Sequence, residues 1–236
     1  MTTLQAPKAK KIPRKLSKHN HTRTDNYYWL NERENPEVIE YLNDENTYTQ
    51  TMLRDTESLQ DTLYHEIKDK IVKDDSSVPY KSNGYWYYSR YEEGFDYPIY
   101  CRKKSNLKSK ELILLNINSL AKDHEYYNIG ALTISPDNKI LCFGVDTLSR
   151  RIYTLYFKNL ITGEILAQSI GQTEGSGIWA EDSNTLFYTQ LDAETLRPHR
   201  VFRYALDGSE NIEIYHEKDD TFWLMSLSLN LKPIFL

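Results

Sequence analysis

The chain has 236 residues and a formal net charge of −5, with 29 basic and 34 acidic residues distributed along its length. Because phosphate binding requires clustered Lys and Arg, this balance argues against a nucleic-acid-binding protein. No apolar stretch approaches the roughly 18 residues of a membrane-spanning helix, and the N-terminus lacks the apolar segment of a signal peptide. We therefore expect a cytoplasmic protein with neither nucleic acid nor a membrane as its partner.

One basic cluster lies at the N-terminus. We interpret it as a solvated and partly mobile tail, with a polybasic contact to a membrane or to RNA as the alternative. The cluster consists of Lys8, Lys10, Lys11, Arg14, Lys15 and Lys18.

Two helices are expected after this tail. The first starts at Asn35-Pro36-Glu37, because Asn caps a helix, Pro lacks only an N–H that would be unpaired there, and Glu faces the positive end of the dipole. The second starts near Asp55 or Thr56. Each helix has an apolar stripe, which predicts packing against a partner elsewhere, since two helices alone offer little core. The stripes are Val38, Tyr41, Leu42, Tyr48 and Met52, then Leu59, Leu63, Ile67 and Ile71.

From residue 78 onward the apolar period changes from helical to alternating. The clearest stretch, residues 131–166, contains four apolar or aromatic runs separated by turn residues, which predicts four antiparallel strands. Similar corners recur at Asn83-Gly84, Asp137-Asn138-Lys139 and Asp182-Ser183-Asn184. Their spacing of roughly 45 to 55 residues is typical of β-propeller blades.

We therefore predict a mainly β fold: a partial β-propeller of about three four-stranded blades and the start of a fourth, preceded by a helical segment. Residues 1–73 are assigned to the tail and helices, and residues 74–236 to the incomplete propeller. Because propellers close with four or more blades, the chain is expected to be part of a longer protein. The blades are placed near residues 78–117, 129–168 and 177–216, with a partial blade at 221–236.

Signals for chemistry are few. Residues 171–177 are rich in glycine but lack the Gly-Lys-Ser/Thr ending of a phosphate loop, so we interpret them as a turn. Cys101 and Cys142 lie in strand-like runs and are predicted to be buried, reduced thiols. No Gly-x-Ser-x-Gly elbow and no set of zinc ligands with a known spacing is present, so we predict no cofactor and no metal.

Several segments, in the right order, resemble oligopeptidase B (protease II), a branch of the prolyl oligopeptidase family of serine peptidases. The resemblance covers about residues 12 to 225. It is carried by Thr24-Asp25-Asn26-Tyr27-Tyr28-Trp29-Leu30 and by residues 35–38, 41–46, 74–80, 84–88, 97–102, 145–147, 150–153, 186–188 and 195–198.

The resemblance implies an α/β-hydrolase domain with a Ser-Asp-His triad, seated on a seven-bladed propeller that admits short peptides and excludes folded proteins. It implies cleavage after Arg or Lys, so short basic peptides are the expected substrates of the complete enzyme. The N-terminal helices would wrap the hydrolase domain, which is expected beyond this chain. No catalytic residue is therefore assigned, and the chain alone is predicted to be inactive.

The candidate contact site is an acidic, aromatic loop between the first and second blades: Asp123, Glu125, Tyr126 and Tyr127. Because the implied substrates are cationic, we expect these residues to contact substrate or the neighbouring domain; a solvated loop is the alternative. A free-standing propeller that binds peptides or proteins is the second function considered. A structural or extracellular repeat protein is the third, and the missing signal peptide disfavours it.

Overall fold

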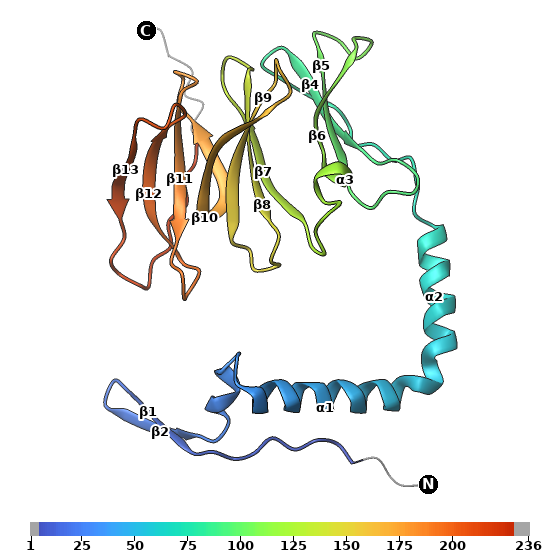
Figure 1. The fold of residues 1–236 in the computed structure, drawn as a ribbon, viewed down its shortest axis with the longest axis vertical. Helices are drawn as coiled ribbons and strands as arrows, with labels where there is room; N and C mark the ends of the chain where they lie inside the picture. Colours follow the sequence, from blue (N-terminus) through green and yellow to red (C-terminus); the bar gives the residue numbers. More distant parts are fainter. Residues whose placement is uncertain (1–4, 229–236) are drawn as a thin grey trace, which may run out of the picture. The chain divides into compact units, whose positions relative to one another are not determined.

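The computed structural model describes residues 5–228, and it separates into two compact units, residues 1–72 and residues 73–236 (Figure 1). Each unit is described by itself. The first contains a hairpin of β1 (Arg14–Lys18) and β2 (His21–Asp25), a 3-10 turn η1 (Tyr28–Asn31), α1 (Pro36–Leu53), η2 (Arg54–Thr56) and α2 (Glu57–Asp69).

The N-terminal segment, interpreted from the sequence as a solvated and partly mobile tail, contains a hairpin. Its two-residue turn is His19-Asn20, with φ values of 53° and 60°. Asparagine tolerates this left-handed conformation, which two-residue hairpin turns require, so Asn20 was a signal that the sequence offered. The six basic residues of the cluster are nevertheless exposed, as expected. The tail is also anchored, because the buried Trp29 donates its indole N–H to the Lys10 carbonyl at 3.0 Å.

The two predicted helices are confirmed. Asn35 caps α1, where its side-chain oxygen accepts a hydrogen bond from the Glu37 backbone N–H at 3.0 Å, and Pro36 is the first helical residue. Val38 is the one buried residue of α1. The apolar stripe of α2 is exposed in the described structure, with Leu59, Leu63 and Ile67 between 46% and 63% exposed. The packing partner expected for it therefore stays a prediction.

The second unit is built from two antiparallel sheets whose strands follow chain order. The first sheet has four strands, β3 (Tyr80–Ser82), β4 (Tyr85–Arg90), β5 (Ile99–Lys104) and β6 (Glu111–Asn116), followed by the short helix α3 (Ile117–Leu120). The second sheet has seven strands: β7 (Asn128–Ile134), β8 (Ile140–Asp146), β9 (Tyr153–Asn159), β10 (Ile165–Trp179), β11 (Thr185–Leu191), β12 (Pro198–Ala205) and β13 (Asn211–His216).

The long strand β10 explains why the second and third blades form one sheet. Its first half pairs with β9 and its second half with β11, so it ends one blade and starts the next. The prediction of a turn at residues 171–177 is therefore wrong. The backbone bends there through two register shifts, with Gln172 at φ 62° and Gly175 at φ 91°. Only glycine fits at 175, because a Cβ there would lie 2.7 Å from the Tyr153 ring.

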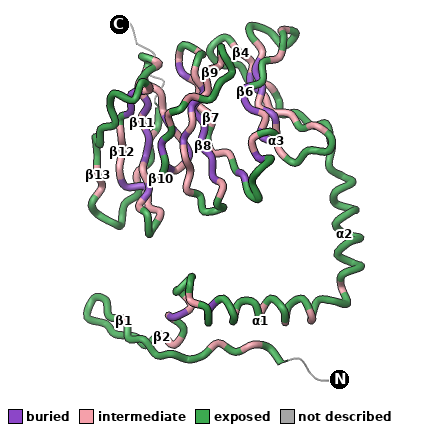
Figure 2. Tube along the Cα trace, viewed as in Figure 1, coloured by how far each residue is buried: buried purple, intermediate pink, exposed green. Residues whose placement is uncertain are grey.

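Two apolar clusters of buried residues lie between successive blades. Figure 2 shows that buried positions are concentrated on the strands of these blades. Strand β8 contributes to both, because its side chains alternate: Leu141 and Phe143 belong to the first cluster and Cys142 to the second. Cys101 and Cys142 are free and buried, which confirms that prediction. Burial raises the pKa of the Cys101 thiol to about 11 and that of Cys142 to about 12.

The three predicted corners are confirmed, and they connect the blades. The Asn83 side-chain amide donates a hydrogen bond to the Pro136 carbonyl in the next blade at 2.7 Å. The Asp137 backbone N–H donates to the Ser183 hydroxyl of the third blade at 3.0 Å. We call this the corner end of the blades. In the predicted fourth blade, residues 221–228 form no strand, and residues 229–236 lie outside the described residues.

Candidate functional site

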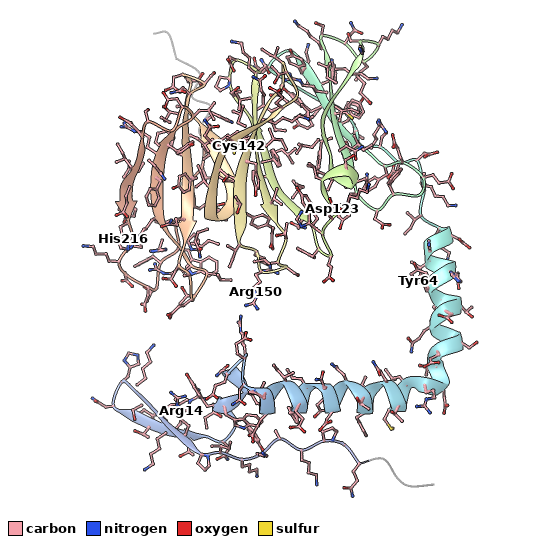
Figure 3. All side chains as sticks on the ribbon, in the orientation of Figure 1. Arg14, Tyr64, Asp123, Cys142, Arg150 and His216 are labelled. Atoms are coloured by element: carbon pink, nitrogen blue, oxygen red, sulfur yellow. The ribbon has the colours of Figure 1, made fainter. Side chains whose placement is uncertain are left out.

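The candidate loop lies at the end of the blades opposite the corners, where it connects α3 to β7. Asp123 and Glu125 are exposed to solvent, and Tyr126 is 37% exposed. The His124 backbone N–H donates to the Ala121 carbonyl at 2.9 Å and closes a turn that presents the two carboxylates. We call this end of the strands the loop end; Asp123 and Arg150 both lie there in Figure 3.

Tyr127 differs from the other three predicted contact residues. It is 8% exposed and belongs to the apolar cluster between the first two blades. Burial raises the pKa of its phenol to about 12. The His124 ring packs on it, with the ring centroids 5.3 Å apart. Tyr127 therefore anchors the loop, whereas Asp123, Glu125 and Tyr126 are the residues free to meet another molecule.

A basic loop between β8 and β9 lies at the same end. The sequence analysis did not predict the hydrogen bonds that fix its conformation. The Asp146 carboxylate is 1% exposed and accepts hydrogen bonds from the backbone N–H groups of Leu148, Arg150 and Arg151 at 2.8, 3.0 and 2.7 Å. These bonds hold a left-handed conformation at Arg151, with φ 59°. The signal was an aspartate at the end of a buried strand, since the side chain of such a residue accepts hydrogen bonds from the backbone that follows it.

Tyr153 lies beside these two loops. Its hydroxyl donates to the Asn128 side-chain oxygen at 2.9 Å. Its pKa is raised, first by burial and then by the nearby groups of Asp146 and Tyr126. The structure thus brings Tyr126, one of the predicted residues, close to Tyr153 and the basic loop.

A groove of about 690 Å³ opens at the loop end beside Tyr153. This volume falls in the range of small-ligand sites, roughly 300–1,000 Å³. We call it the Glu174 groove, after the single carboxylate in its lining. It is lined by Arg151, Tyr153, Glu174, Leu191, Thr195, Leu196, Pro198, Trp223, Leu224 and Met225.

Local hydrogen bonds build one wall of the Glu174 groove. Arg197 donates to the backbone carbonyls of Glu217, Asp219 and Phe222 at 3.3, 3.0 and 2.8 Å, and so holds the segment that carries Trp223. Asp192 accepts bonds from the Thr195 backbone N–H and hydroxyl at 2.8 and 2.9 Å, and these bonds keep the pKa of Asp192 below its usual value. The wall is therefore preorganised.

The Glu174 carboxyl is the chemical centre of the groove. Its side chain is partly buried, and burial raises its pKa, an effect that hydrogen bonds from Ser176 and Thr189 oppose. The Ser176 hydroxyl lies 3.2 Å from Glu174 Oε1. Within residues 5–228, no Lys, Arg or His nitrogen forms an ion pair with this carboxylate, although Arg151 lines the same groove. Glu174 is thus a carboxylate without an ion-pair partner among the described residues, in a lining that is mostly aromatic and aliphatic but also includes Arg151.

No serine or cysteine side chain in the described part of the chain is hydrogen-bonded to a histidine, and no cluster of three or more metal-ligating side chains occurs there. A second cavity, of about 370 Å³, lies between the first two blades and has a neutral lining that includes Tyr80, Tyr87 and Asn138. No helix within residues 5–228 has both the length and the apolar character needed to cross a membrane.

The comparisons with known proteins agree with this architecture. The family model described as "Prolyl oligopeptidase, N-terminal beta-propeller domain" matches residues 7–232. Over 225 residues the chain is 39% identical to "Dipeptidyl aminopeptidase BI" of Pseudoxanthomonas mexicana, covering 87% of this chain and 31% of that protein. It is 33% identical over 243 residues to "Protease 2" of Moraxella lacunata, covering 99% of this chain and 35% of that protein.

Solved structures are similar as well. Oligopeptidase B from Leishmania major superposes with a TM-score of 0.85 at 29% identity, covering 93% of this chain and 34% of that one. Oligopeptidase B from Trypanosoma brucei superposes with a TM-score of 0.81 at 24% identity, which shows the shared fold. The chain spans about a third of the length of these relatives.

The resemblance to oligopeptidase B inferred from the sequence, and the mainly β propeller fold, are confirmed by these comparisons. Because the family model spans residues 7–232 and the strands form antiparallel propeller blades, the chain belongs to the prolyl oligopeptidase family, as its N-terminal β-propeller region.

Proposed function

We propose that this chain is the propeller portion of a serine oligopeptidase that cleaves short peptides after Arg or Lys. The family match over residues 7–232 carries the proposal, and the similarity to Protease 2 and to oligopeptidase B supports the basic-residue preference. The propeller would limit the size of the peptides that reach a catalytic α/β-hydrolase domain elsewhere in the complete protein. A free-standing binding module has no comparable support, and the cytoplasmic location stays a prediction.

The chain alone is expected to be catalytically inactive. Support comes from the described residues, which hold no hydrogen-bonded Ser–His or Cys–His pair, and from the chain's span of about a third of its relatives. The test is cleavage of a blocked, Arg-containing fluorogenic peptide by the purified chain. No turnover above background is expected. Turnover that a serine-reactive inhibitor abolishes would contradict the proposal, and a downstream reading frame with Gly-x-Ser-x-Gly would support it.

The exposed loop residues Asp123, Glu125 and Tyr126 are proposed to contact the cationic substrate or the neighbouring domain. Their exposure and the two carboxylates beside an anchored aromatic residue support this role. In a full-length enzyme that contains this chain, reversal of both charges should lower kcat/KM for an Arg substrate. An unchanged kcat/KM would remove the loop from the site.

A second activity deserves a direct test, because one relative, 39% identical, is named a dipeptidyl aminopeptidase. The complete enzyme would then release dipeptides from a free N-terminus instead of cleaving internal bonds. Two substrates that end in Arg before the reporter, one with a free N-terminus and one with a blocked N-terminus, separate the two activities. Cleavage of the blocked substrate supports the oligopeptidase, and cleavage of the free one alone supports the dipeptidyl peptidase.

A further inference from the structure

We propose that the Glu174 groove binds a cationic side chain, a guanidinium or primary ammonium group carried by a short peptide. The assignment of a peptide as the occupant rests on the proposed function. The assignment of the groove's chemistry rests on the described residues alone.

The first argument is charge. A carboxylate that is taken out of water is destabilised unless an opposite charge or several hydrogen bonds compensate it. Glu174 accepts a hydrogen bond from the Ser176 hydroxyl at 3.2 Å, and no cation forms an ion pair with it within the described part of the chain. A ligand that brings a positive charge would supply the missing partner, so the groove should discriminate by charge.

The second argument is the shape and chemistry of the walls. Trp223 and Tyr153 contribute aromatic surface, and Leu191 and Met225 contribute aliphatic surface, around the one carboxylate. Arg151 is the one basic residue in the lining, and it forms no ion pair with Glu174. Arg and Lys match such a site, because their stems pack on apolar surface while their heads bind a carboxylate or lie over an aromatic face. An apolar peptide would leave Glu174 buried without a counter-charge.

A metal ion does not fit this groove as well. Calcium requires about six to eight oxygen ligands and a structural zinc requires four. Glu174 is the single carboxylate in the lining, and the groove contains neither histidine nor cysteine. An organic cation with hydrogen-bond donors and an apolar stem therefore matches the lining better than a metal ion does.

The third argument is preorganisation. Arg197 binds three carbonyls of the segment before Trp223, and the Leu224 backbone N–H donates to the Pro198 carbonyl at 3.0 Å. The Thr189 and Ser226 hydroxyls lie 3.2 Å apart and connect β11 to the same segment. A groove whose walls are held in this way loses little conformational entropy when a ligand enters.

The test is a titration of the purified chain with two matched probes, Nα-acetyl-arginine amide and its neutral isostere Nα-acetyl-citrulline amide. Isothermal calorimetry measures both affinities. Arginine amide should bind about tenfold more tightly than citrulline amide, since a charge-assisted bond to Glu174 forms only with the former. Equal affinities, or no measurable binding of arginine amide, would overturn the proposal.

Two variants locate the binding. Glu174→Gln should abolish the preference for arginine amide, whereas Glu164→Gln, which removes an exposed carboxylate directly before β10, should leave it unchanged. Persistence of the preference in Glu174→Gln would place the site elsewhere. If that variant fails to fold, Trp223→Leu decides: a loss of about threefold in arginine affinity supports the groove, and unchanged affinity contradicts it.

The outcome is separable from that of the proposed function. Binding of arginine amide here, together with no cleavage after Arg by the full-length enzyme, would overturn the peptidase specificity and leave the groove assignment intact. Cleavage after Arg by the full-length enzyme, without binding of arginine amide by this chain, would overturn the groove assignment and leave the peptidase specificity intact.

Discussion

The two ends of the propeller blades differ in what holds them together. At the corner end, hydrogen bonds link each blade to the next through Asn83, Asp137 and Ser183. At the loop end, Asp123, Glu125, Arg150 and Arg151 are exposed, and Glu174 has no ion-pair partner among the described residues. The corner residues thus form hydrogen bonds between blades, whereas Asp123 and Glu125 at the loop end are exposed to solvent. This is the pattern expected where stability and binding are separated.

The largest expected effect contrasts one leucine inside β8 with one in the loop that follows it. Leu141 lies near the corner end and is fully buried, whereas Leu148, just past the loop end, is 69% exposed. Leu141→Ala should lower the free energy of unfolding by about 2–5 kcal/mol, because it leaves a cavity. Leu148→Ala is the matched control and should change it by less than about 0.5 kcal/mol. Urea unfolding measures both, and similar losses would contradict the contrast.

A smaller effect is expected for the bond between the first two blades. Asn83→Gly keeps a residue suited to φ 42° and removes the donor to the Pro136 carbonyl. We expect a loss of about 1 kcal/mol in unfolding free energy. Asn20→Gly, in the hairpin turn at φ 60°, is the control and should cost far less. If Asn83→Gly unfolds at the same urea concentration as the wild type, the corner bond does not stabilise the propeller.

The smallest effect concerns Glu174 and has a defined pH dependence. Burial raises its pKa in the folded state, so the folded chain holds this proton more tightly than the unfolded chain does. The stability that protonation contributes is therefore present below the unfolded pKa and is lost as pH rises through the folded pKa. Glu174→Gln should stabilise the chain at neutral pH by less than about 1 kcal/mol, and the gain should vanish at lower pH. A variant that is less stable than the wild type at neutral pH would contradict this sign.

The sequence predicted features that depend on near neighbours in the chain. Asn35 before Pro36 was enough to place the start of α1, and the turn residues at Asn83, Asp137 and Ser183 were enough to place the corners. These residues act through their own backbone preferences, which the sequence displays directly.

Features made by distant segments were missed. The bend of β10 arises because two blades share this strand. The need for glycine at position 175 cannot be inferred without knowing that the Tyr153 ring lies against it. The Glu174 groove is lined by residues of β10 and by Trp223. Arg197 positions the segment that carries Trp223 by donating a hydrogen bond to the Phe222 carbonyl. No local pattern around Glu174 indicates these partners, so periodicity and turn signals could not predict the groove.

The most direct test of the claim that the loop end binds a ligand is to map the binding of arginine amide by NMR on the chain labelled with nitrogen-15. We predict chemical-shift changes at the backbone amides of Tyr153, Glu174 and Thr195, and none at the corner amides of Asn83, Asn138 and Ser183. Shifts concentrated at the corner end, or none at either end at saturating probe, would contradict the account.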